Sequence, residues 1–166
     1  MDKTSFLGIQ TVENILKTYG NDILRLSYSY MKNISDSEDV LQDTLIKYMN
    51  TMPVFESTSH QKAWLFRVAI NICKNKLKSS WFKTEQLSED YTMLTDFNDN
   101  ENMIIGAINS LTVKYREVLF LFYYEGYSTM EIAKILNKKE STVRSLLLRA
   151  RKKLKTILKE AYDFYE

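Results

Sequence analysis

The sequence predicts an all-α chain made of two small helical domains joined by an acidic flexible linker, the C-terminal domain being a helix-turn-helix. Its 166 residues include only four glycines and one proline, too few turn formers for a many-stranded sandwich or barrel. Hydrophobic residues make up 45% of the chain, and several segments repeat them at the spacing of an amphipathic helix. These features favour helices connected by short loops.

Charge is distributed unevenly, although the net charge is only +2. Residues 61–84 contain six basic residues and no acid, and residues 134–159 contain ten basic residues and one acid, Glu140. Residues 85–101 contain six acids, no base and no sustained helical period, so we place a linker at residues 81–101, between domains of residues 1–80 and 102–166. Two basic lobes joined by an acidic segment suit a nucleic-acid binder, although either basic run alone could be a solvated face.

The N-terminal domain begins with a helix over residues 12–28, where apolar residues recur at i, i+3, i+4 and i+7. The string SDSE then predicts a capping box, with Ser35 as the cap and Glu38 reaching back to it. The following helix is expected to bury Val40, Leu41, Leu45, Tyr48 and Met49. Its polar face carries Asp36, Asp39 and Asp43. Acids in a first turn gain about 0.3–1 kcal/mol each from the helix dipole, but an acidic stripe also suits protein docking, and both interpretations stay open.

A third helix, AWLFRVAINICKNKLKS at residues 63–79, combines cations and amides on one stripe. The expected buried side is Trp64, Leu65, Val68, Ala69, Ile72 and Leu77. The stripe contains Arg67, Asn71, Lys74 and Lys78, with Asn75 beside it. Cations hold phosphates and amides bond base edges, so the stripe suits a nucleic-acid strand, although lysine stems that snorkel at a surface would look the same.

The C-terminal domain has the signature of a helix-turn-helix. A helix from about Val113 is followed by a turn, a capping box of Ser128 and Glu131, a short helix and Asn137, which tolerates the left-handed conformation. Ser141 or Thr142 is then expected to cap a long basic helix. Close crossing of the two helices would use Ala133, Val143, Leu146, Leu147 and Ala150. Base contacts are expected from Thr142, Arg144, Ser145 and Arg149, and phosphate contacts from Lys138, Lys139, Lys152 and Lys153.

Catalysis has little support in this sequence. One histidine, one cysteine, no glycine-rich phosphate loop and no paired carboxylates near the basic faces predict that the chain is not an enzyme and needs no cofactor or metal. The single cysteine, Cys73, excludes a disulfide within the chain, and no window reaches membrane-spanning length, so we expect a cytoplasmic protein.

These motifs, in this order, resemble extracytoplasmic-function (group IV) sigma factors of RNA polymerase over nearly the whole chain. SDSEDVLQDTLIKYMN is similar to the family's D-A-E-D-x-x-Q-E-x-F docking helix. The resemblance implies that the β′ clamp helices are contacted by Asp36, Glu38, Asp39, Gln42 and Asp43. AWLFRVAINICKNKLKS resembles the W-L-Y-R-I-A-x-N segment, which reads the −10 element together with the preceding loop, here residues 55–62. The implied −10 residues are Ser57, Thr58, His60, Lys62, Arg67, Asn71, Lys74, Asn75 and Lys78.

STVRSLLLRARKKLK resembles the family's −35 reader, which implies −35 contacts by Lys138, Lys139, Thr142, Arg144, Ser145, Arg149, Lys152 and Lys153. Relatives usually carry Arg or Lys where Leu146 stands, so a phosphate contact is expected to be missing. The resemblance implies a sigma factor that binds core RNA polymerase through β′ and β, directs it to promoters and helps initiate transcription. Its other implied partners are promoter DNA and an anti-sigma factor, often membrane-bound in this family, with no small-molecule substrate. The alternative is an autonomous helix-turn-helix regulator, which would have no use for the docking helix or the basic–amide helix.

Overall fold

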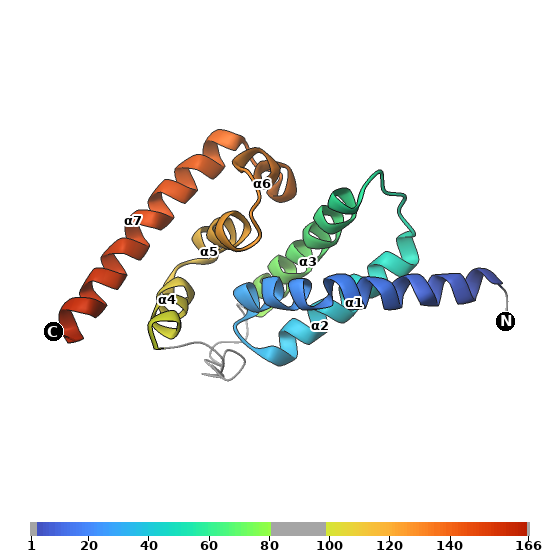
Figure 1. Cartoon of the computed structure of the whole chain (residues 1–166), viewed down its shortest axis with the longest axis horizontal. Helices are drawn as coiled ribbons and strands as arrows, with labels where there is room; N and C mark the ends of the chain where they lie inside the picture. The colour runs from blue at the N-terminus through green and yellow to red at the C-terminus, as the bar shows by residue number, and fades with distance from the viewer. Residues whose placement is uncertain (1–2, 81–98, 166) are drawn as a thin grey trace. The chain divides into compact units, whose positions relative to one another are not determined.

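The computed structural model describes residues 3–80 and 99–165, and within these ranges every regular element is helical (Figure 1). The chain divides into two compact units, Met1–Glu89 and Asp90–Glu166. The predicted all-α, two-domain fold is therefore confirmed. Most of the predicted linker lies outside the described residues. Its end, residues 99–101, was wrongly assigned, because the first helix of the second unit already begins at Asp99.

The first unit is a three-helix bundle of α1 (Lys3–Met31), α2 (Ile34–Thr51) and α3 (Thr58–Ser80), each packed against the other two. Its fully buried apolar residues recur at helical spacing and include Ile23 and Leu26 of α1, Val40 of α2, and Leu65, Phe66 and Ala69 of α3. Burying a large aliphatic or aromatic side chain contributes about 1.5–3 kcal/mol, so this shared core fixes how the faces of α2 and α3 are presented.

Small hydroxyl residues let these helices approach closely. Ser27 and Thr44 are fully buried, and each hydroxyl donates to a carbonyl of its own helix, Ser27 Oγ to Ile23 O at 2.7 Å and Thr44 Oγ1 to Val40 O at 2.7 Å. Buried polar groups are tolerated when they are hydrogen-bonded in this way.

The start of α2 differs from the prediction. The cap is Asn33, whose Oδ1 accepts from the Asp36 amide at 2.8 Å and whose Nδ2 donates to the Asp36 carboxylate at 2.7 Å. Asn33 has extended backbone angles (φ −147°, ψ 155°), whereas Ser35 already lies inside the helix, so the predicted Ser35–Glu38 capping box is wrong. The helix ends at Thr51, and its C-cap, Met52, adopts the left-handed conformation (φ 45°) before Pro53.

The second unit contains α4 (Asp99–Ser110), α5 (Val113–Leu119), a π-helical turn η2 (Phe120–Tyr124), α6 (Thr129–Leu136) and α7 (Glu140–Tyr165). α4, α5 and α6 all pack against α7. The five residues predicted to allow close helix crossing are all buried, as expected: Ala133, Val143, Leu146, Leu147 and Ala150.

The turn signals of the helix-turn-helix are largely confirmed. Ser128 Oγ accepts from the Glu131 amide at 3.2 Å, while the Ser128 amide donates to Glu131 Oε2 at 2.7 Å, which completes the predicted capping box. Asn137 is left-handed (φ 53°, ψ 50°), as predicted. The predicted cap of α7 is wrong, because α7 begins at Glu140 and both Ser141 and Thr142 lie inside its first turn.

Candidate functional site

The outward face of α2 carries most of the predicted docking residues. Glu38, Asp39 and Gln42 are exposed. The other two predicted acids have partners inside the unit: Asp36 is half-buried in the Asn33 cap, and Asp43 lies 3.8 Å from Lys76 of α3. Asp43 is itself exposed but belongs to this ion pair, so the docking face is built around Glu38, Asp39 and Gln42.

Two exposed apolar residues extend this face toward the end of α2. Ile46 is 42% exposed and Met49 is 46% exposed, and they follow Asp39 and Gln42 at intervals of three to four residues, so all four lie on one side of the helix. The prediction that Met49 is buried is wrong, because the buried face of α2, formed by Ser37, Val40, Thr44 and Tyr48, lies on the other side of the helix. Sequence reasoning missed Ile46, although its spacing from Asp39 was a usable signal.

The predicted stripe on α3 faces outward as expected. Arg67, Asn71, Asn75 and Lys78 are exposed, and Lys74 is half-buried. The opposite face contains residues that are at most 2% exposed, namely Leu65, Phe66, Ala69, Ile70 and Cys73. The core therefore holds the cations and amides on a rigid helix.

Cys73 belongs to that core. Burial raises the pKa of its thiol to about 12, so the thiol stays protonated at neutral pH and is no nucleophile.

The segment before this stripe is more helical than predicted. Only residues 55–57 of the predicted loop are non-helical, because Ser57 Oγ accepts from the His60 amide at 3.1 Å and α3 begins at Thr58. His60 Nδ1 in turn accepts from the Glu56 amide at 3.3 Å, which gives the exposed imidazole a place in the helix cap. The assignment of Thr58, His60 and Lys62 to a loop is therefore wrong: all three lie in the first turns of α3.

An aromatic cluster supports the short loop. The Phe55 ring stacks on Tyr48 at 6.3 Å between centroids and meets the edges of Trp64 at 5.8 Å and His60 at 5.3 Å. Offset-stacked and edge-on geometries are the favourable ones for aromatic pairs. The loop leading into α3 is thus anchored by Phe55.

Lys62 is also tied to the bundle. Its ammonium lies 3.5 Å from Asp22 of α1 and 5.4 Å from the centre of the Phe66 ring. A contact of Lys62 with DNA would therefore compete with an existing ion pair.

On the helix-turn-helix, the exposed side of α7 forms two adjacent stripes. Thr142, Ser145, Arg149 and Lys152 recur at three- and four-residue intervals on one stripe. Arg144, Leu148 and Arg151 follow the same interval on the neighbouring stripe. The exposed Lys139 and Lys153 complete the predicted cations of this face, and Lys153 Nζ lies 5.0 Å from the centre of the Tyr115 ring.

The structure gives two positions considered for phosphate contacts, Lys138 and Leu146, a role inside the fold. Lys138 is half-buried, and its ammonium lies 3.7 Å from Glu117, whose side chain is only 2% exposed, so this lysine neutralises a buried carboxylate. Leu146 is 6% exposed and points into the core. The interpretation of Leu146 as a missing phosphate contact is therefore wrong, because in this chain the position does not belong to the outward face.

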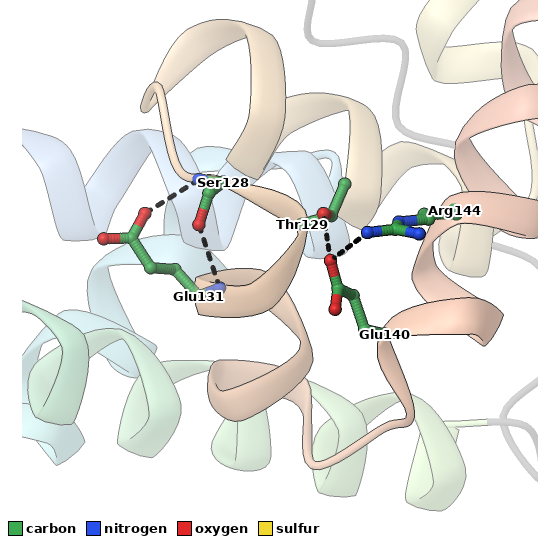
Figure 2. A network of polar contacts seen from close by, with 5 residues as sticks. All are labelled: Ser128, Thr129, Glu131, Glu140 and Arg144. Atoms are coloured by element: carbon green, nitrogen blue, oxygen red, sulfur yellow. Dashed lines mark hydrogen bonds and ion pairs between the residues drawn. The ribbon is translucent and has the colours of Figure 1, made fainter.

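Arg144 is held by a network at the start of α7 (Figure 2). Its Nη2 donates to Glu140 Oε1 at 2.7 Å, and Thr129 Oγ1 of α6 donates to the same oxygen at 2.9 Å. The Thr129 hydroxyl and then the Arg144 guanidinium lower the pKa of Glu140, which stays ionised at neutral pH. The network joins both helices of the helix-turn-helix to one predicted base-reading side chain.

Arg151 is a cation that the sequence did not single out. Its Nε donates to the Tyr123 hydroxyl at 2.5 Å, and its guanidinium lies 5.4 Å from the ring centres of Phe122 and Tyr123. The π-helical turn contributes both rings, a local geometry without a clear signal in the sequence.

Two kinds of structural feature are absent from the described part of the chain. No three His, Cys, Asp or Glu side chains gather there in a metal-binding group. Among the described helices, none combines the length and apolar character needed to cross a membrane.

Comparison with known families assigns both units. Residues 15–83 match the family model of Sigma-70 region 2, and residues 101–154 match that of Sigma-70, region 4. These regions, in this order, define a transcription initiation factor of the sigma-70 type. The chain is 30% identical to SigM of Bacillus subtilis strain 168, an ECF RNA polymerase sigma factor, over 89% of this chain and 94% of that protein. It is 32% identical to the ECF sigma factor SigL of Mycobacterium tuberculosis H37Rv over 76% of each. The chain belongs to the family of ECF RNA polymerase sigma factors.

Two solved structures share the fold. The sigma factor RpoE, in complex with the anti-sigma factor NepR from Bartonella quintana, has a TM-score of 0.73 at 24% identity, over 89% of this chain and 96% of that one. CnrH, in complex with the cytosolic domain of CnrY, has a TM-score of 0.67 at 21% identity, over 91% and 89% of the two chains.

Family membership establishes the general function. The chain is a sigma factor that directs RNA polymerase to promoters and takes part in transcription initiation. Sigma factors are initiation factors without enzymatic activity of their own.

Proposed function

We propose that three helix faces divide the work of promoter recognition: α2 docks on core RNA polymerase, α3 binds the −10 element and assists strand opening, and α7 binds the −35 element. One observation carries this proposal. Both α3 and α7 expose cations with amide or hydroxyl side chains on a face directly opposite a buried core face, in the units that match regions 2 and 4. Rigid presentation of such groups suits nucleic-acid contacts.

Docking on the polymerase is supported by the composition of the α2 face. Exposed apolar side chains at Ile46 and Met49 sit beside the charged and amide groups of Glu38, Asp39 and Gln42. An apolar centre with a polar rim is typical of protein interfaces, and acids at the rim would steer the helix toward a cationic surface. We assign this face to the β′ clamp helices, with further contacts to the β subunit.

Strand opening is supported by α3. Phosphates would be held by Arg67, Lys74 and Lys78, while Asn71 and Asn75 could bond base edges or sugars. Flipping a base out of a duplex costs a few kcal/mol, which contacts to the separated strand would offset. Ser57, Thr58, His60 and Lys62 remain candidates for contacts at the start of the helix.

An anti-sigma factor is the further partner that we propose, because one structural neighbour, RpoE, was solved in complex with the anti-sigma factor NepR. The exposed apolar face of α2 would be one surface available to it, and such a factor could be anchored in a membrane. We also propose the group IV subgroup, since the matched models are regions 2 and 4. Because a sigma factor must share a compartment with the chromosome, we place the chain in the cytoplasm.

The experiment that tests this division uses holoenzyme on the upstream region of the chain's own operon, with run-off transcription and permanganate footprinting of the opened strands. Asn71→Ala should impair opening more than closed-complex formation, whereas Arg149→Ala should reduce closed-complex formation first. Asn14→Ala, which removes an exposed amide from α1, is the matched control and should do neither.

The same assay separates a sigma factor from an autonomous regulator. The chain alone should bind this promoter weakly and need core polymerase for specific binding, whereas a regulator would bind alone. If holoenzymes with Asn71→Ala and with Ser57→Ala opened the promoter strands normally, α3 would only bind phosphates. Its proposed role in strand opening would then be refuted.

A further inference from the structure

Helix α7 begins with a side-chain network that the proposed base contacts do not explain. Glu140 is the first residue of α7, Arg144 lies one turn later, and Thr129 lies at the start of α6 (Figure 2). A single carboxylate oxygen, Glu140 Oε1, accepts from Thr129 Oγ1 at 2.9 Å and from Arg144 Nη2 at 2.7 Å. Arg144 is thereby connected to the first helix of the helix-turn-helix as well as to its own.

The network restricts a side chain that would otherwise be mobile. The Arg144 side chain is 68% exposed, whereas that of Glu140 is 30% exposed. A long exposed arginine samples many rotamers, and a charge-assisted bond to a fixed partner removes much of this freedom. The carboxylate is a suitable anchor because Thr129 holds it and because an acid in the first turn is favoured by the helix dipole.

We propose that Glu140 is a positioning residue for promoter reading, which holds the Arg144 guanidinium in one orientation while Thr129 fixes the carboxylate. The inference rests on the proposed assignment of α7 to the −35 element. The bond to Glu140 uses one N–H of Nη2, and a guanidinium has five N–H donors, so a bidentate pair with guanine O6 and N7 is compatible with the network. Preorganisation of this kind favours the correct base because less side-chain freedom is lost on binding.

Glu140 should also act in the opposite direction on overall affinity. It is the only acid in residues 134–159, among ten basic residues, and a negative charge near phosphates weakens binding to any sequence. Glu140 is therefore expected to lower the affinity for random DNA and to raise the preference for guanine at one base pair. These two quantities can be measured separately.

The test measures promoter binding by holoenzyme, reconstituted from core polymerase and the full chain, with duplex libraries randomised across the upstream element. Thr129→Val keeps the negative charge of Glu140 but removes the hydroxyl that donates to its carboxylate. It should lower the guanine preference at the base pair assigned to Arg144 by about three- to tenfold, part of what one bidentate pair supplies, without changing affinity for random DNA. Glu140→Ala should lower this preference further and raise affinity for random DNA.

Three controls separate the possible explanations. Glu160→Gln removes an exposed acid from the same helix and should leave the guanine preference unchanged. Arg144→Ala should abolish the preference, and in that background Thr129→Val should have no further effect on it. Thermal denaturation of each variant identifies any loss of folding.

The outcomes are distinguishable. If Arg144→Ala loses the guanine preference while Thr129→Val and Glu140→Ala retain it in full, the positioning role is refuted and base reading by Arg144 stands. An equal loss of binding to all sequences, together with a lower melting temperature, would make the network merely structural and would also refute the inference. If Arg144→Ala itself retains the preference, base reading by Arg144 fails and the positioning role fails with it.

Discussion

Reversing the charge of Asp39 should abolish binding to core polymerase without unfolding the protein. Asp39 is exposed on the outward face of α2, beside the exposed Ile46. Asp43 is a poorer choice, because its carboxylate lies 3.8 Å from Lys76 and a lysine there would repel that ammonium within the folded unit. The single variant Asp39→Lys therefore isolates docking from folding.

The expected magnitudes differ for folding and binding. Asp39 lies beyond the first turn of α2, where the helix dipole has faded, so the free energy of unfolding should change by no more than about 0.5 kcal/mol. At an interface, placing like charges opposite each other costs several kcal/mol. A loss of about 3 kcal/mol would weaken binding to core polymerase by more than about 100-fold.

Competition binding to core polymerase against labelled wild-type chain measures this loss, and urea denaturation measures stability. The matched control is Glu13→Lys, which makes the same charge change at an exposed position of α1. The control should bind core polymerase normally. Binding of Asp39→Lys within about twofold of wild type would show that the acid serves only solubility, and the docking assignment would fail.

Three further predictions concern the described helices. Arg149→Ala should lose about 1–3 kcal/mol of binding free energy, and only at the base pair that Arg149 reads. Lys152→Ala should instead weaken binding to all DNA sequences and flatten the salt dependence of binding. If both variants lost affinity equally for all sequences, base reading by Arg149 would be refuted. Leu146→Arg should destabilise the protein by at least about 1.5 kcal/mol in urea denaturation without raising promoter affinity, because Leu146 is 6% exposed; a stable variant with tighter binding would contradict its core role. The pKa of Cys73 is raised from 9.0 to about 12, so folding should weaken above pH 9, where the unfolded thiol ionises first. Native alkylation of Cys73 should be slow from pH 7 to 9, and fast labelling would show an accessible thiolate.

The fold was predictable because its signals are local. Helical periodicity and a capping box each depend on residues within one or two helical turns of one another. The small number of turn formers favours helices throughout the chain. The Ser128–Glu131 box and the left-handed Asn137 were predicted at the correct residues, since each depends on side chains only a few positions apart.

Helix boundaries were less predictable, because several residues nearby could serve as the cap. Asn33 rather than Ser35 caps α2, and its extended backbone decides between them. His60 completes the cap of α3 where a glutamate is the familiar signal, so the local pattern does not mark the start of this helix. Cap identity depends on backbone angles that composition does not reveal.

The candidate faces were predicted, but their exposure was only partly predicted. Periodicity groups residues on a face, yet the neighbouring helices decide which apolar residues they cover, as Met49 and Leu146 show. The ion pairs that hold predicted contact residues join positions far apart in the sequence, such as Lys138 with Glu117 and Asp43 with Lys76. Pairs of this kind follow from packing and have no local signature.

These ion pairs divide the cations proposed to contact DNA into two kinds. The first kind has an acid partner in the fold and includes Lys62 with Asp22, Lys138 with Glu117, and Arg144 with Glu140. The second kind is exposed on α7 and includes Arg149 and Lys152. A cation that already has an acid partner gains less from a phosphate, because the ion pair offsets part of the attraction. Release of counterions, and with it the salt dependence of binding, should come mainly from the second kind. Salt also screens an exposed pair such as Arg144 with Glu140. Contacts to base edges nevertheless release fewer counterions than contacts to phosphates, so discrimination by Arg144 should decline less with salt than total affinity does.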